Sequence, residues 1–119
     1  MTKIVINACY GGFGLSPEAC ELFNTKKNLK KGNKKYINPE YGYLPSSVSR
    51  HDKYLVQVVE ELGEKANGKH ADLIIMTTKG YQYRIEEYDG NESLETPETD
   101  YWNIIDTPDT RDRFPEAFL

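Results

Sequence analysis

The first two dozen residues constrain this chain most, because they predict a strand, a glycine-rich turn and a helix in direct succession. The β-branched run Ile4-Val5-Ile6 predicts a strand over about residues 3–8 that is buried on both faces. Glycines at 11, 12 and 14 then predict a tight turn. Ser16 suits an N-cap and Pro17 the first helical position, so we predict a helix from about 17 to 24.

The turn offers two features of an anion-binding site. Glycines let backbone amides approach a ligand, and a helix start carries unpaired N–H groups with a partial positive charge. The candidate ligand-binding residues of the turn are Tyr10, Gly11, Gly12, Phe13, Gly14 and Ser16. We expect Lys30 and Lys31 of the following loop to close over the ligand. The alternative is a purely structural turn with Tyr10 and Phe13 folded into the core.

Length and composition predict one soluble domain over residues 1–119, large enough to bury roughly two thirds of its unfolded surface. No apolar run approaches the roughly 18 residues of a membrane span, and Met1 leads directly into a strand without a signal peptide. We therefore expect a cytoplasmic protein with Cys9 and Cys20 reduced. These cysteines and two histidines match no zinc pattern, so we predict no metal and no cofactor.

The charge is distributed unevenly along the chain. Residues 1–80 carry 12 basic and 8 acidic side chains, whereas residues 81–119 carry 3 basic and 11 acidic ones. This asymmetry can steer partners or join the two ends of the chain. Two separately solvated faces are the alternative interpretation.

Residues 25–48 form a predicted insertion loop rich in lysine and tyrosine. Its lysines fall in pairs, its tyrosines follow at 36, 41 and 43, and Asn38-Pro39 and Leu44-Pro45 mark turns. Basic residues beside tyrosines can hold phosphates and stack bases, but such contacts need a folded, convergent patch. A solvated loop is the alternative, and we do not expect nucleic acid as the partner.

A second helix is the clearest prediction. Apolar residues spaced at i, i+3, i+4, i+7 and i+11 form one stripe, namely Leu55, Val58, Val59, Leu62 and Ala66. The helix is predicted to begin near Ser49 or Asp52. Asn67-Gly68 is predicted to supply a left-handed C-terminal cap.

The remaining strands are predicted at 72–78 and 81–88, joined as a hairpin through Lys79-Gly80. Asp89-Gly90 is predicted to end the second of them in a turn. Residues 90–119 form an acidic extension. Within it, the apolar residues 101–105 are expected to dock on the body as an edge strand or an irregular anchor.

The motif from Cys9 to Pro17 resembles the phosphate loop of the low-molecular-weight protein tyrosine phosphatases, in which strand one ends in Cys, five residues, Arg, Ser and Pro. The resemblance implies a nucleophile at Cys9, with Ser16 steadying its thiolate. The chain departs from the family at Leu15, which stands in place of the phosphate-gripping arginine. The family's late Asp-Pro is also missing. These departures indicate disabled phosphatase chemistry.

A second resemblance covers residues 3–90. The strings CYGGFGLS at 9–16, ELGEKANG at 61–68 and IEEYDG at 85–90 resemble a group of small, functionally uncharacterised bacteriophage proteins. This resemblance implies a phage origin, and hence the cytoplasm of a host cell, but it brings no activity. The insertion and the acidic extension lie outside the shared pattern.

Together these observations predict an α+β fold with a mixed sheet of three or four strands and two helices on one face. The first strand and 72–78 are expected to be parallel, with 81–88 added antiparallel. The expected function is that of a non-catalytic phage-type binding protein, holding a nucleotide-like, phosphate-bearing small ligand or a host protein. The alternatives are a phosphatase-like enzyme that uses Cys9, or a structural or interaction protein. No membrane partner is expected, and homo-oligomerisation is left open.

Overall fold

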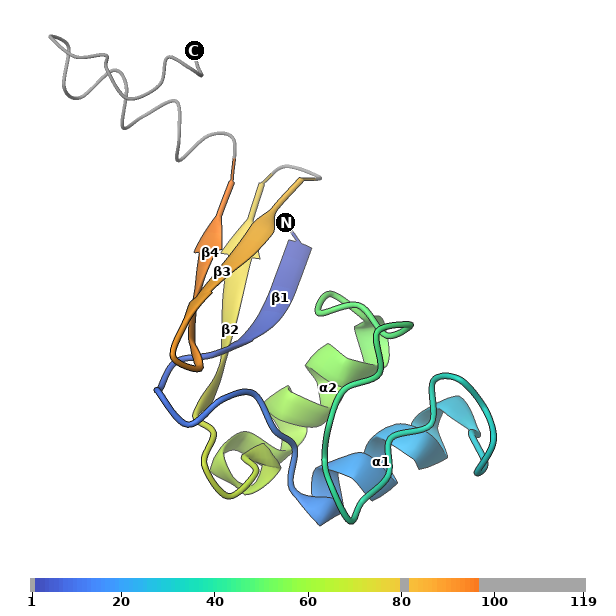
Figure 1. The fold of residues 1–119 in the computed structure, drawn as a ribbon. Coiled ribbons are helices and arrows are strands. Elements are labelled where there is room, and N and C mark those ends of the chain that lie inside the picture. The colour runs from blue at the N-terminus through green and yellow to red at the C-terminus, as the bar shows by residue number, and fades with distance from the viewer. Residues whose placement is uncertain (1, 80–81, 97–119) are drawn as a thin grey trace, which may run out of the picture.

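The computed structural model describes residues 2–79 and 82–96. Its elements in chain order are β1 (Thr2–Asn7), α1 (Pro17–Lys27), α2 (Lys53–Leu62), the 3-10 helix η1 (Gly63–Ala66), β2 (Leu73–Thr78), β3 (Arg84–Tyr88) and β4 (Asn91–Glu95). The α+β class is confirmed. The mixed sheet of three or four strands is wrong, because the strands form two separate two-stranded antiparallel ribbons (Figure 1). The docking expected of residues 101–105 lies outside the described residues.

β1 and β2 are antiparallel and not parallel, with a register from Thr2↔Thr78 to Asn7↔Leu73. A parallel partner would have to start at the Thr2 end of β1. The chain instead returns at the Asn7 end, where the Asp72 N–H donates to Asn7 Oδ1 at 2.7 Å. The side chain of Asn7, which is fully buried, thus helps to fix the direction of β2.

The predicted hairpin between 72–78 and 81–88 is also wrong, because β3 pairs with β4. The turn between them is Asp89-Gly90, with φ values of 52° and 90°. Positive φ at both central residues matches the right-handed twist of a two-residue hairpin, which is why Asp-Gly is a strong hairpin signal. The dipeptide was predicted to end a strand, whereas it connects two strands, β3 and β4, that pair with each other.

Both helices begin where expected and end elsewhere. Ser16 caps α1 through its hydroxyl, which accepts from the Ala19 N–H at 3.1 Å, and α1 continues to a left-handed Asn28 with φ 55°. Asp52 caps α2 by accepting from the amides of the first turn. α2 ends at Gly63, with φ 58°, so the predicted cap at Asn67-Gly68 is wrong. None of the described helices has the length and apolar character needed to cross a membrane.

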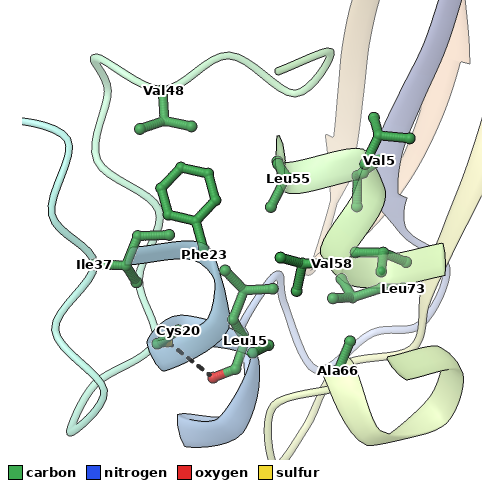
Figure 2. Packing of buried hydrophobic residues seen from close by; sticks show 13 residues of the cluster. Val5, Leu15, Cys20, Phe23, Ile37, Val48, Leu55, Val58, Ala66 and Leu73 are labelled. Atoms are coloured by element: carbon green, nitrogen blue, oxygen red, sulfur yellow. Dashed lines mark hydrogen bonds between the residues drawn. The ribbon is translucent and has the colours of Figure 1, made fainter. Parts of the chain in front are cut away.

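The main core lies between the helices and one face of the β1–β2 ribbon (Figure 2). The predicted stripe of α2 is buried there, apart from a partly buried Leu62. The insertion contributes Ile37 and Val48, both buried. Asn24 of α1 holds the insertion down, because its amide bonds to both the N–H and the carbonyl of Ile37 at 2.9 and 2.8 Å. The insertion is therefore a packed part of the fold.

The second ribbon, β3–β4, packs against β1. The carboxylate of Glu92 in β4 forms a bidentate ion pair with Arg50, at 2.7 and 2.8 Å. The same carboxylate accepts from the N–H of Asn7 at 2.8 Å. The Glu92 side chain is only 7% exposed, so a buried charge is fully paired at this junction.

Candidate functional site

The glycine loop, defined here as residues 9–16, leaves β1 at Asn7. The Asn7 side-chain amide donates to the carbonyls of Cys9 and Gly90 at 2.8 and 2.7 Å. Its oxygen accepts from Asp72. One buried side chain therefore holds the start of the glycine loop, the hairpin turn and the entry to β2 together.

The glycines of this loop allow backbone to pack directly on backbone. A Cβ on Gly11 would overlap the carbonyl oxygen of His70. Two other segments also approach the loop closely. A Cβ on Gly68 would lie 2.8 Å from the carbonyl carbon of Gly14, and one on Gly90 would lie 2.7 Å from the Gly12 nitrogen. Gly12 itself has φ 95°, which favours glycine. Within the loop, close packing therefore accounts for Gly11, and backbone conformation accounts for Gly12.

Three of the amides around the helix start, those of Leu15, Ser16 and Ala19, already have partners. The Leu15 N–H donates to Gly42 O at 3.0 Å, and the Ser16 N–H donates to Ala66 O at 2.9 Å. The Ala19 N–H donates to Ser16 Oγ, and the Ser16 hydroxyl donates to Lys65 O at 2.6 Å. Glu18 in the first turn adds a negative charge. An anion at this end of α1 would meet few free donors and a like charge.

The aromatic side chains of the loop diverge. Tyr10 is 63% exposed, so its placement in the core under the structural alternative is wrong. Phe13 does pack against the core, and the Arg50 guanidinium lies 4.0 Å from its ring centroid. This stacking gives Arg50 a cation–π contact in addition to its ion pair with Glu92.

Cys9 does not have the surroundings of a phosphatase nucleophile. Its S–H donates to His70 O at 3.1 Å and contacts Asn7 Oδ1 at 3.5 Å, and both contacts need the proton that a thiolate lacks. Leu15, at the arginine position of the phosphatase motif, is 3% exposed and points into the core (Figure 2). Burial, with a smaller effect from Glu21, raises the pKa of the other thiol, Cys20, to about 12.

Lys30 and Lys31 lie at the opposite end of α1 from the glycine loop. α1 has 11 residues, so roughly 16 Å of helix separates its two ends. A shallow depression of about 500 Å³ lies at the lysine end, where Lys30 and Tyr36 line it together with residues of α1. The structure thus brings the predicted glycine-loop residues together but does not bring the two lysines to them.

The insertion presents a feature that was not among the predicted site residues. Tyr41 and Tyr43 are 63% and 73% exposed, and their rings lie parallel with centroids 6.2 Å apart. Between them, Gly42 is buried with φ 72°, and its carbonyl accepts from Leu15. The Tyr-Gly-Tyr sequence is the signal that could have indicated two aromatic rings displayed from an anchored turn.

No protein-family model matches this chain, and no curated protein or solved structure gives a significant match.

Proposed function

We propose that this protein is a non-catalytic binding protein that recognises a protein partner through the tyrosine pair, defined as Tyr41 and Tyr43. The observation that carries the proposal is the exposed, parallel stacking of these rings beside a buried glycine. Tyrosine supplies a large, amphipathic contact area at low entropic cost and is enriched in protein interfaces. The resemblance to phage proteins makes a bacterial host protein the partner to seek.

The anchoring of Gly42 supports this assignment. A Cβ on Gly42 would overlap the Leu15 carbonyl oxygen, so the turn is seated directly on the backbone at the start of α1. Both the Tyr41 and the Gly42 N–H groups donate to Asn38 O, at 3.1 and 2.9 Å. A turn held in this way loses little freedom when a partner binds, which favours affinity.

Contacts of the glycine loop favour a protein over a phosphate-bearing ligand. The amides of Leu15 and Ser16 are already bonded, and Lys30 and Lys31 lie beyond the far end of α1. The enzyme alternative is weaker still, because Cys9 uses its S–H as a donor and Leu15 is buried.

Affinity capture from bacterial lysate tests the proposal when three proteins are compared. The wild type and Tyr88→Ser should retain the same specific partner, whereas Tyr41→Ser/Tyr43→Ser should lose it. Tyr88 is a matched control, since it is 78% exposed and lies in β3. The three proteins should melt within about 2 °C of one another, because exposed substitutions of this kind change stability little.

A thermal-shift screen with inorganic phosphate, ATP and cyclic nucleotides tests the alternative, a phosphate-bearing small ligand. A bound ligand at about a hundred times its dissociation constant would stabilise the fold by about 2.7 kcal/mol. A shift that disappears in Gly12→Val would contradict the protein-partner proposal and support an anion site in the glycine loop. A partner that Tyr41→Ser/Tyr43→Ser still captures would contradict the tyrosine pair as the binding surface.

A further inference from the structure

β1 is hydrogen-bonded along both of its edges. The Val5 N–H donates to Arg50 O at 2.9 Å, and the Asn7 N–H donates to Glu92, so these odd-numbered residues face away from β2. In an antiparallel pair, the residues opposite them also face away from the shared ladder. The register therefore turns the backbone groups of Ile75 and Thr77 towards the outer edge of β2.

The outer edge of β2 lacks a strand partner within residues 2–79 and 82–96. Within the described residues its first position has a partner, since the Leu73 N–H donates to Asn67 Oδ1 at 2.8 Å. No described residue accepts from the N–H of Ile75 or Thr77. An apolar edge strand with free backbone groups is a template for a further strand.

The face of the ribbon opposite the helices is also only half covered. Side chains alternate along a strand, so Ile4 and Ile6 lie on the face opposite Val5, and both are buried. Their cross-strand partners Met76 and Ile74 remain 37% and 36% exposed. The open edge of β2 is therefore bordered by apolar surface.

We propose that the open edge and outer face of β2 are the docking site for residues 101–105 of this chain, which add to β2 as an antiparallel third strand. Four of these five residues are aromatic or β-branched, namely Tyr101, Trp102, Ile104 and Ile105. Such residues favour strands. The outer face of β2 offers them apolar contacts, and its edge offers them hydrogen bonds.

The direction of β4 and the length of the chain that follows it support residues 101–105 as the segment that binds β2. Asn7 bonds to both Asp72 and Gly90, so β2 and β4 each start near it and run away from it. β4 thus ends at the same end of the ribbon as β2 (Figure 1). Residues 97–100 allow residue 101 to lie up to roughly 17 Å from Thr96, a reach of about three strand spacings of roughly 5 Å each. A segment returning from there runs antiparallel to β2.

The tether also favours this segment over a second copy of the chain. A short connection holds residues 101–105 near β2 at a millimolar effective concentration. A β2 strand from another molecule has no such advantage at micromolar protein concentration.

Amide hydrogen exchange of the full-length protein tests the proposal. The amides of Ile75 and Thr77 should exchange about tenfold or more slowly in the wild type than in Trp102→Ser/Ile104→Ser. Phe114→Ser/Phe118→Ser is the matched control, since it removes two apolar residues beyond the docking segment. The amides of Ile74 and Met76, which face β1, should exchange equally in all three proteins.

Trp102 provides an independent readout, because it is the one tryptophan of the chain. Met76→Lys should shift its emission towards that of indole in water, whereas Tyr88→Lys should not. Fast exchange at Ile75 and Thr77 in the wild type would overturn the proposal. So would protection that persists in Trp102→Ser/Ile104→Ser, and protection that grows with protein concentration would assign the edge to a second copy.

Discussion

The two loops that flank α1 differ in how they are held against the rest of the chain. The glycine loop, residues 9–16, is packed through its backbone, and the backbone at His70 and at Gly90 lies directly against it. The insertion that follows α1 is held chiefly by buried side chains such as Ile37 and Val48, with a close backbone contact at Gly42, while its tyrosine pair faces solvent. In the first loop close packing requires glycine at position 11, and the second loop displays two parallel tyrosine rings on its surface.

Glycine is required in this chain for two different physical reasons. Gly11 and Gly68 have no room for a Cβ, because backbone atoms occupy the space. Gly32 has nothing within 4 Å of that position and is glycine because of its φ of 96°. A glycine in the first class is fixed by its neighbours, whereas one in the second is fixed by its own backbone conformation.

The largest expected effect comes from Leu15→Arg, which restores the arginine of the phosphatase motif. Leu15 is 3% exposed in the core, so an arginine there would bury an unpaired charge. We expect a loss of about 4 kcal/mol or more in urea unfolding and no hydrolysis of p-nitrophenyl phosphate. Leu15→Met should cost less than about 1.5 kcal/mol.

A stable Leu15→Arg protein that hydrolyses p-nitrophenyl phosphate would contradict the conclusion that the glycine loop is a packed structural turn, provided that Cys9→Ser abolishes the activity. The glycine loop would then be a catalytic loop lacking one residue.

An intermediate effect is expected from the same substitution in the two loops. Gly11→Ala should lose about 3 kcal/mol of unfolding free energy, because the methyl group displaces the His70 backbone. Gly32→Ala should lose about 1 kcal/mol, the cost of a left-handed conformation in open space. Equal losses in chemical denaturation would show that the packing of the glycine loop is no tighter than that of the insertion.

The smallest effect concerns an ion pair between α1 and the residue that caps α2. Lys27 of α1 pairs with Asp52, whose carboxylate caps α2. Burial raises the pKa of the Asp52 carboxyl, but the hydrogen bonds from Lys27 and the α2 amides outweigh it. The pKa therefore lies below its ordinary value of 3.8. A lowered folded-state pKa stabilises the protein above the unfolded-state pKa, and this contribution disappears as the pH falls through the folded-state value.

We therefore expect Asp52→Asn, which keeps the cap, to be less stable than the wild type by about 1 kcal/mol at pH 7. In a series of thermal melts the difference should begin to shrink as the pH falls below about 4 and should vanish once the pH lies below the folded-state pKa of Asp52. Lys27→Met should weaken this pH dependence, because the α2 amides still bond the carboxylate, and Lys53→Met should preserve it. A stability difference between the wild type and Asp52→Asn that persists to pH 2 would show that the substitution acts through packing and not through the charge of Asp52.

Local rules predicted a good part of this fold. Ser16 and Asp52 cap their helices as their side chains suggest, and the apolar stripe from Leu55 to Ala66 faces the core. The end of α2 was predicted wrongly, because Gly63 and Asn67-Gly68 carry similar local signals. The glycine loop was recognised as a turn, but its lack of free amides at Leu15 and Ser16 depends on partners that are 27 and 50 residues away along the chain.

What the sequence determined by itself was most of the elements, since caps and apolar spacing act between residues a few positions apart, although β4 was not predicted. Tertiary structure alone decided how those elements pair. β2 runs antiparallel to β1 because Asn7 bonds to Asp72, 65 residues later, and the hairpin docks through the ion pair between Arg50 and Glu92. These contacts join polar groups from distant segments in a buried setting, where an unpaired partner is costly. Only the folded chain brings them together.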